Sequence, residues 1–206
     1  MSGMTVEEIY VLNSALDGED IFGLSSFSEI GASKMMFGSV NEQLIRKELL
    51  ETESSLTMQG VQMVKTLDDY KKSKKYLKLG TLIIGLSEDD VAVALISSGD
   101  PVEYEFQYVS MEDGYDHICK VYPFLSMKPG GISEREIDYE ELIKEQAVSP
   151  ENILKLSTYS GRGKEETAEV FFSADDKLYL YNEMTKLLEE PFFETMKVIQ
   201  ERMALQ

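Results

Sequence analysis

The residues best suited to chemistry are the single histidine and the single cysteine, which stand two apart in Asp116-His117-Ile118-Cys119. A nucleophile and its base must touch, but side chains two residues apart on a helix do not face each other. No second histidine is present to complete a catalytic triad or a common zinc site. We therefore interpret His117 and Cys119 as structural residues.

A glycine-rich segment, Ser160-Gly-Arg-Gly-Lys164, resembles a phosphate-binding loop only in part. The Walker pattern is not met, and the segment lies between two predicted strands instead of before a helix. We predict a hairpin turn there.

Adjacent carboxylates occur at 89–90, 112–113 and 175–176, and such pairs arise by chance among 38 acidic residues. They lack the ligand spacing and the central glycine of an EF-hand loop. We predict no metal, no cofactor and no enzymatic activity. A hydrolase that uses carboxylates alone stays open as an alternative, and it would need a deep pocket with carboxylates of raised pKa.

Composition limits the classes of partner. The 206 residues are 43% hydrophobic, enough for one large domain or two apposed lobes. The net charge of −18 argues against nucleic-acid binding, which depends on Lys and Arg, and against adsorption to anionic membranes. The acidic start, the lone cysteine and apolar runs far below roughly 20 residues predict a cytoplasmic protein without membrane insertion.

Two capping boxes, Thr5-x-x-Glu8 and Ser39-x-x-Glu42, predict the start of two helices. Between these helices, residues 18–38 are predicted to form a loop packed onto the body, because apolar side chains are scattered through it.

A longer helix is predicted to begin at Ser55 or Thr57 and to include Leu77. Its last turns would carry the one basic cluster of the chain, which consists of Lys71, Lys72, Lys74, Lys75 and Lys78. Cations at a helix C-terminus complement the helix dipole. The alternative is a docking patch for an acidic partner.

Two stretches follow one plan of three short apolar strands on tight turns, bracketed by helical segments. The predicted strands are 79–84, 91–97 and 102–109, then 153–159, 168–172 and 178–181. The predicted fold is α+β, with two pseudo-twofold-related units, each an antiparallel three-strand meander flanked by helices. The Pro-Gly-Gly segment at 129–131 predicts a boundary between residues 1–128 and 129–206 of tightly packed lobes.

Further helices are predicted over 111–122, over 133–146, and from about 182 to the end with a break at Pro191. The helix–helix–strand–strand order between residues 39 and 97 also fits a winged helix. Such a fold would serve as a protein-binding scaffold, because a basic face for DNA is missing beyond the lysines around 71–78.

A partner surface is predicted from the aromatic and methionine content, because the chain has 11 Met, 11 Tyr and 9 Phe. Methionine is frequent on adaptable binding surfaces, and tyrosine is enriched at interfaces. The candidate partner-binding residues are Met35, Met36, Phe37, Tyr104, Phe106 and Tyr108. The alternative for each of them is a place in the core.

Three features of the sequence carry a resemblance to a known family. They are the segment TVEEIYVLNSAL, the segment TMQGVQMVKTLDDYKKSKKYLKLGTLIIGL, and the two predicted strands after it, which close on SSGD. Over about residues 4–125 the chain resembles the EspG-like accessory proteins of type VII (ESX) secretion systems, especially their relatives in Gram-positive bacteria. The resemblance implies a cytosolic chaperone, monomeric or homodimeric, that binds helical-hairpin secretion substrates. WXG100-type or LXG-type proteins are the implied clients.

An immunity protein that neutralises a cognate toxin is the alternative function. Acidic proteins suit that role because many nuclease toxins are basic.

Overall fold

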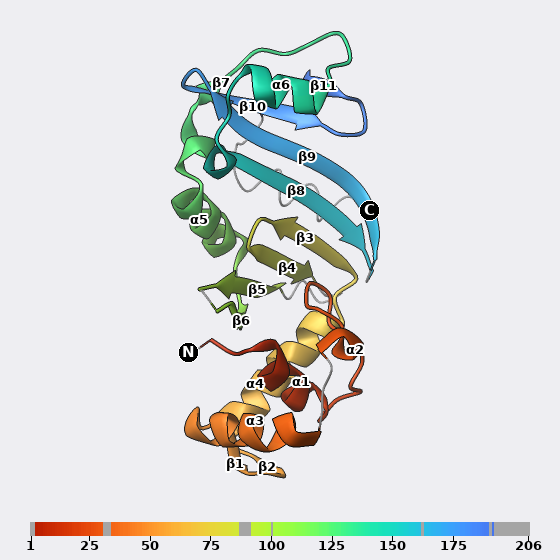
Figure 1. The fold of residues 1–206 in the computed structure, drawn as a ribbon, viewed down its shortest axis with the longest axis vertical. Helices are drawn as coiled ribbons and strands as arrows, with labels where there is room; N and C mark the ends of the chain where they lie inside the picture. Colours follow the sequence, from red (N-terminus) through yellow and green to blue (C-terminus); the bar gives the residue numbers. More distant parts are fainter. Residues whose placement is uncertain are drawn as a thin grey trace. The chain divides into compact units, whose positions relative to one another are not determined.

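The chain forms two compact units (Figure 1). The computed structural model describes residues 3–30, 34–86, 92–99, 101–161, 163–189 and 191. Unit 1 comprises Met1–Lys74 and Gly85–Tyr108, and unit 2 comprises Lys75–Ile84 and Val109–Gln206. The boundary predicted after residue 128 falls inside unit 2, and the division into two lobes at that point stays a prediction.

Unit 1 is built on helices. They are α1 (Val6–Asn13), α2 (Phe27–Ile30), α3 (Lys34–Arg46) and α4 (Met58–Lys71), with a small hairpin of β1 (Leu50–Thr52) and β2 (Ser55–Leu56) between α3 and α4. The capping box of α1 is confirmed: Thr5 Oγ1 accepts from the Glu8 N–H, and Glu8 Oε2 accepts from the Thr5 N–H. The second predicted box is wrong, because α3 begins at Lys34 and Ser39 lies inside it.

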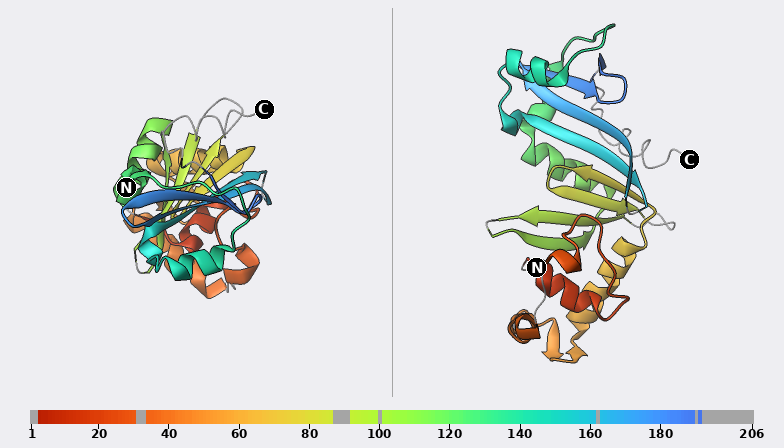
Figure 2. Two further views of the ribbon diagram at one scale, coloured as in Figure 1. Left: turned by 90° about the horizontal axis from the view of Figure 1, so that it is seen from above. Right: turned by 45° about the vertical axis from the view of Figure 1, so that its right-hand side comes forward.

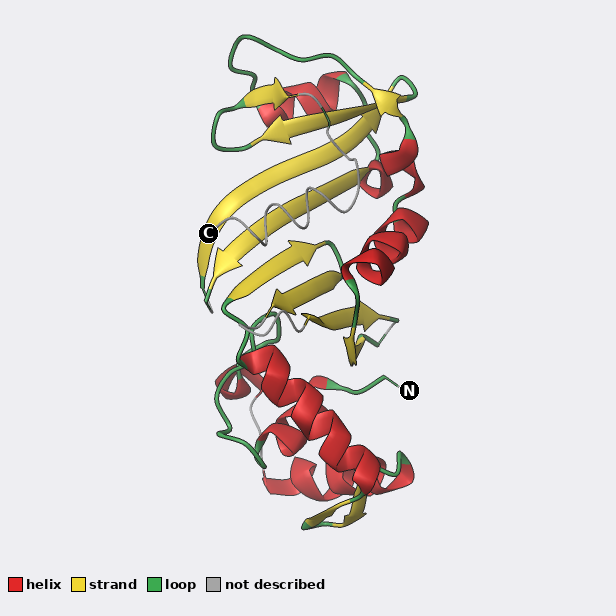
Figure 3. Cartoon of the chain, turned by 180° about the vertical axis from the view of Figure 1, so that it is seen from behind, coloured by secondary structure: helices red, strands yellow, loops and turns green. Residues whose placement is uncertain are grey.

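The core of unit 1 forms where α1 meets α3 and α4 (Figure 3). Ile9, Leu12 and Leu44 are buried there. The predicted loop at 18–38 contains α2 and the start of α3, and Ile21 within it is buried.

An antiparallel pair, β5 (Ala92–Ser98) and β6 (Glu103–Tyr108), packs against α4. Both strands were predicted at nearly these positions.

The predicted long helix is too long. α4 ends at Lys71, and the next residues form β3 (Lys75–Leu79) and β4 (Leu82–Leu86), where one strand over 79–84 was predicted. Gly80, at φ +57°, occupies the turn between them, a backbone conformation that glycine adopts readily. β3 pairs with a distant strand, β8 (Ile153–Ser160), and this pairing overrides the local helical preference. The turn predicted at 87–90 lies outside the described residues.

Unit 2 is a mostly antiparallel sheet. It contains β8, β9 (Lys164–Ala174), β10 (Lys177–Asn182) and β11 (Leu187–Glu189), in the order β11-β10-β9-β8-β3-β4. A short strand, β7 (Lys128–Pro129), pairs parallel with β10. The meander of β8, β9 and β10 was predicted, and the α+β class is confirmed.

Four helical segments complete the described part of unit 2. They are α5 (Met111–Val121), the 3₁₀ turns η1 (Pro123–Ser126) and η2 (Pro150–Asn152), and α6 (Tyr139–Glu145). α6 lies beside β9 and β10 (Figure 2), where Tyr139, Leu142 and Ile143 pack on a core of Val170, Phe172, Ala174 and Tyr181.

Two predicted helices of unit 2 need correction. α6 begins after its N-cap Asp138, because the preceding segment is held along β11: the Ser133 N–H donates to Leu188 O at 2.9 Å. The terminal helix predicted from about 182 is wrong at Leu187–Glu189, which pair with β10 as β11. Residues 192–206, where most of that prediction falls, lie outside the described residues.

Candidate functional site

One face of the unit 2 sheet is the candidate site. Alternate residues of a strand point to the same face, so Lys155, Ser157 and Tyr159 of β8 share one side of the sheet. Ile153, on the same side, pairs with Phe172, which belongs to the core beneath α6. Farther along β8, Lys155 is exposed and Tyr159 is partly exposed. The polar half of this face therefore remains accessible.

A groove of about 380 Å³ opens on this side of unit 2. The residues that line it are Lys78, Gly80, Tyr122, Ile153, Leu154, Lys155, Ser157, Tyr159 and Glu165. The volume is at the lower end of the range of small-ligand pockets, roughly 300–1,000 Å³. β3 and β8 supply most of its wall, and their register sets Lys78 opposite Ser157.

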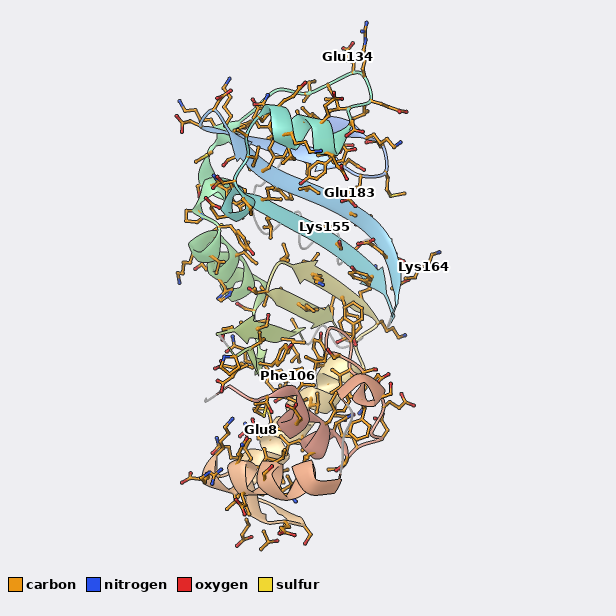
Figure 4. The ribbon with its side chains drawn as sticks, in the orientation of Figure 1. Glu8, Phe106, Glu134, Lys155, Lys164 and Glu183 are labelled. Atoms are coloured by element: carbon orange, nitrogen blue, oxygen red, sulfur yellow. The ribbon has the colours of Figure 1, made fainter. Side chains whose placement is uncertain are left out.

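An ion-pair network organises one end of the groove. Lys155 Nζ lies 2.8 Å from Glu183 Oε2 and 3.9 Å from Glu165 Oε1. The Tyr159 hydroxyl donates to Glu165 Oε1 at 3.2 Å. Figure 4 labels Lys155 and Glu183 over this region of the sheet, whereas Lys164 points away from it. Lys155 is thus held between two carboxylates.

The surroundings shift the pKa of three groups in the network away from neutral pH: Lys155, Glu165 and Tyr159. The hydrogen bond with Glu183 raises the pKa of Lys155, so the ammonium stays charged. Hydrogen bonding from Ser157, helped by the charge of Lys155, lowers the pKa of Glu165. Desolvation raises the pKa of Tyr159, so the phenol stays neutral. These are fixed charges and fixed donors, not groups poised to exchange protons.

At the other end of the groove, Tyr122 follows α5 and its ring lies edge-on to Phe124, with the centroids 6.1 Å apart. A side-chain carbon at Gly80 would overlap Tyr122 Oη, so the phenol lies directly against the turn between β3 and β4. Lys78 is exposed on β3, two residues before this turn.

The predicted aromatic residues of β6 share one side of the strand but differ in accessibility. Phe106 is 2% exposed and meets the Tyr70 ring edge-on at 5.2 Å, so it fills the core of unit 1. Tyr108 is 46% exposed, and its hydroxyl donates to Asp69 Oδ2 at 2.6 Å. Tyr104 is partly exposed, and its backbone forms a bridge with Met4. A partner-binding role for this group stays a prediction.

The other predicted partner residues, Met35, Met36 and Phe37, lie in the first half of α3. Their side chains are outside the described part of the structure. Their binding role also stays a prediction.

Only part of the basic cluster lies at a helix C-terminus: Lys71 is the last residue of α4, and Lys72 is its C-cap. Lys71 is buried, its ammonium bonded to Asn13 Oδ1 at 2.7 Å and paired with Asp17. Lys72 is exposed and paired with Asp68, one helical turn back. Lys75 and Lys78 belong to β3. The interpretation as dipole-complementing cations is therefore wrong for the lysines beyond the helix end.

The other sequence motifs have ordinary positions. His117 and Cys119 lie on α5 and are both partly exposed, and Cys119 forms no disulfide. The predicted turn at Ser160-Gly-Arg-Gly-Lys164 is confirmed, because it joins β8 to β9. Asp175 and Asp176 form the β9–β10 turn, both with positive φ. The pair at 89–90 and the side chains of the pair at 112–113 lie outside the described residues.

Within the described residues, no group of three or more His, Cys, Asp or Glu side chains is arranged to hold a metal ion. No helix in this part of the chain is long and apolar enough to cross a membrane.

The fold and the groove define an α+β protein whose candidate site consists of fixed charges on a sheet face. The chain matches the model of a protein family described as Domain of unknown function (DUF5081) over residues 2–196. The match covers most of the chain, so the protein belongs to this family. No curated protein matches the sequence.

Reasoning from the sequence missed the network residues Lys155, Tyr159, Glu165 and Glu183. The signal for Lys155 and Tyr159 was present: polar residues alternate with Leu154 and Leu156 along a strand, which predicts one solvent-exposed face. Glu165 lies on the next strand, β9, and reaches the network because it pairs with Tyr159. Glu183 carried no such signal, because it follows the end of β10 and reaches Lys155 only through the pairing of three strands.

Proposed function

We propose that this protein is a non-enzymatic cytosolic chaperone or adaptor that binds helical-hairpin substrates of the WXG100 or LXG type for a type VII secretion system. The resemblance of residues 4–125 to EspG-like accessory proteins names this class of client. The single structural observation that supports a binding role is the charge state of the groove. The pKa values of Lys155, Tyr159 and Glu165 are shifted away from neutral pH.

A general acid or base works best with a pKa near the working pH. In the groove, the pKa of Lys155 and of Tyr159 is raised from values already basic, and the pKa of Glu165 is lowered from a value already acidic. Each shift makes proton transfer at neutral pH harder. Such a surface suits recognition, in which fixed charges orient a partner.

Client binding also needs apolar contact. On α4, Met58 is 85% exposed and Val61, one turn later, is 50% exposed. Residues three apart on a helix are neighbours, so the two side chains form a short apolar stripe. The apolar face of an amphipathic client helix can pack on such a stripe. The net charge of −18 keeps a complex of this kind in solution.

Co-expression with a helical-hairpin protein encoded beside it tests the proposal. The two chains are expected to co-elute in size-exclusion chromatography, and the client alone is expected to aggregate. The double variant M58E/V61E should abolish co-elution, because charges would replace the apolar stripe. Q62E, at an exposed position of the same helix, is the matched control. If no neighbouring hairpin protein co-elutes with the wild type, the proposal fails.

An immunity protein against a cognate toxin is the second candidate, and the net charge of −18 favours it because many nuclease toxins are basic. Rescue of growing cells from a co-expressed toxin separates the two functions. A chaperone for export leaves the toxin's active site open and gives no rescue. An immunity protein restores growth.

A further inference from the structure

The groove of unit 2 contains two polar groups that no other group in the described part of the chain satisfies. Lys78 is exposed, and its ammonium forms no ion pair with any described residue. The Tyr122 hydroxyl likewise forms no hydrogen bond among the described residues. Both groups line the same groove. They differ in this from Lys155, which has two carboxylate partners.

The surroundings hold the backbone of Lys78 and the ring of Tyr122 in place. The backbone of Lys78 is paired with Ser157 across the β3–β8 ladder, so the root of its side chain is fixed. Tyr122 packs edge-on against Phe124, and its hydroxyl lies against the backbone of Gly80. The Tyr122 N–H donates to Ile118 O at 2.8 Å, which extends the last turn of α5. A ligand that meets these donors would therefore order the Lys78 side chain but little of the backbone.

The chemistry of the unsatisfied groups selects the ligand. An ammonium has three donors and no acceptor, and a tyrosine hydroxyl donates one proton. Glu165, the acceptor in the groove wall, already receives the Tyr159 hydroxyl and lies near Lys155. The groove thus offers unused donors, and an ionised carboxylate accepts hydrogen bonds only. We propose that the groove binds a carboxylate side chain in an acidic segment of the client polypeptide, with Lys78 and Tyr122 as donors.

The charges in and around the groove favour binding through direct hydrogen bonds over electrostatic attraction at long range. Lys155 lies between Glu165 and Glu183, so Lys78 is the remaining cation of the groove. The charge of Lys78 already contributes to lowering the pKa of Glu165, so a bound carboxylate shares that ammonium with Glu165. The chain as a whole, at −18, repels an acidic segment at a distance. At physiological salt this repulsion is screened beyond about 8 Å, whereas direct hydrogen bonds persist.

The test uses the full chain, labelled with ¹⁵N, at 150 mM salt. The probe is the blocked peptide acetyl-Gly-Glu-Leu-Glu-Gly-amide, and its matched control replaces both glutamates with glutamine. The acidic peptide is expected to shift the amide signals of Lys78, Tyr122 and Ile153 in a saturable way. The glutamine peptide is expected to bind at least tenfold more weakly. Shifts confined to other residues would overturn the proposal.

Three variants sharpen the result. K78M should weaken the acidic peptide at least tenfold, and Y122F should weaken it several-fold while it keeps the ring. K164M removes an exposed lysine that points away from Lys155 and should leave binding unchanged (Figure 4). Far-ultraviolet circular dichroism checks that each variant is folded. Equal binding by K78M and the wild type refutes the role of the groove. Equal saturation by acetate alone refutes a polypeptide ligand.

The proposal rests on the proposed function only for the identity of the polypeptide, and the two can fail separately. If a client co-elutes with the wild type and equally well with K78M, the chaperone role stands and the groove proposal falls. If the acidic peptide binds as expected but no hairpin protein co-elutes, the groove stands and the chaperone role falls.

Discussion

Lys155 Nζ lies 2.8 Å from Glu183 Oε2, although Lys155 belongs to β8 and Glu183 follows the end of β10, on the other side of β9. The register carries the link: Lys155 pairs with Val170 on β9, and Val170 pairs with Tyr181 on β10. The Glu183 N–H then donates to Ala168 O at 3.1 Å, which holds the residue beside the sheet. This ion pair spans three strands and holds the Lys155 ammonium in the wall of the groove.

The pKa of the Glu165 carboxyl should change when a partner in this network is removed. In S157A its pKa should rise most, because hydrogen bonding from Ser157 is the largest cause of its low value. In K155M the pKa should rise less, because only the charge of Lys155 is removed. Carbon-detected NMR titration of the Glu165 carboxyl measures both shifts. K164M is the control and should leave the pKa of Glu165 unchanged. An unchanged pKa of Glu165 in S157A would exclude the hydrogen bond between Ser157 and Glu165.

The network of Lys155 with Glu183 and Glu165 should make stability depend on pH at both extremes. The raised pKa of Lys155 means that its stabilisation is present below its ordinary pKa of 10.5 and is lost as the pH rises through the higher folded value. The lowered pKa of Glu165 means that its stabilisation is present above 4.5 and is lost as the pH falls through the lower folded value. Between these limits wild type should exceed K155M by about 1 kcal/mol or less, because the pair is half exposed. Urea unfolding across pH measures the difference, and a constant difference from pH 3 to 12 contradicts this.

Two adjacent lysines of α4 should differ sharply in their effect on stability. Lys71 is 3% exposed and donates to the buried amide oxygen of Asn13. K71M leaves that oxygen without its donor and should destabilise unit 1 by about 1–3 kcal/mol. Lys72 is exposed, so K72M should change little. Urea unfolding compares the two variants, and equal effects would count against the buried position of Lys71.

Two helical glycines should respond in opposite directions to the same substitution. A Cβ at Gly60 of α4 would overlap the backbone carbonyl of Leu49, whereas a Cβ at Gly38 of α3 meets nothing within 4 Å. G60A should destabilise by about 1–3 kcal/mol, because the strain exceeds the gain in helix propensity. G38A should stabilise by up to about 1 kcal/mol. Thermal unfolding measures both, and a more stable G60A would show that α4 does not approach Leu49 so closely.

Substitutions of Phe106 and Tyr108 in β6 should affect different properties, the first stability and the second client binding. F106A should destabilise unit 1 by about 3–5 kcal/mol, because it removes a buried ring that packs on Tyr70. Y108A removes a ring that is 46% exposed and should change stability within about 1 kcal/mol. If Tyr108 belongs to the predicted partner surface, Y108A should also weaken client co-elution. Client binding identical to wild type would remove Tyr108 from that surface.

The sequence by itself determined the features whose causes are local. The capping box of Thr5 and Glu8 needs one turn of helix, and the meander of β8, β9 and β10 needs only short turns between alternating strands. Each of these signals acts over a few residues, so composition and spacing sufficed to predict them.

Only the tertiary structure decided the rest, because the deciding partners are distant in the chain. Residues 75–79 have a helical pattern, yet they become β3 because β8 offers a ladder of backbone bonds and a buried site for Leu77 and Leu79. Lys71 lies among the other lysines in sequence, yet Asn13 and Asp17 bind it in the interior. The groove likewise exists only once β3 lies against β8. Such contacts cost chain entropy before they form, and no local pattern encodes them.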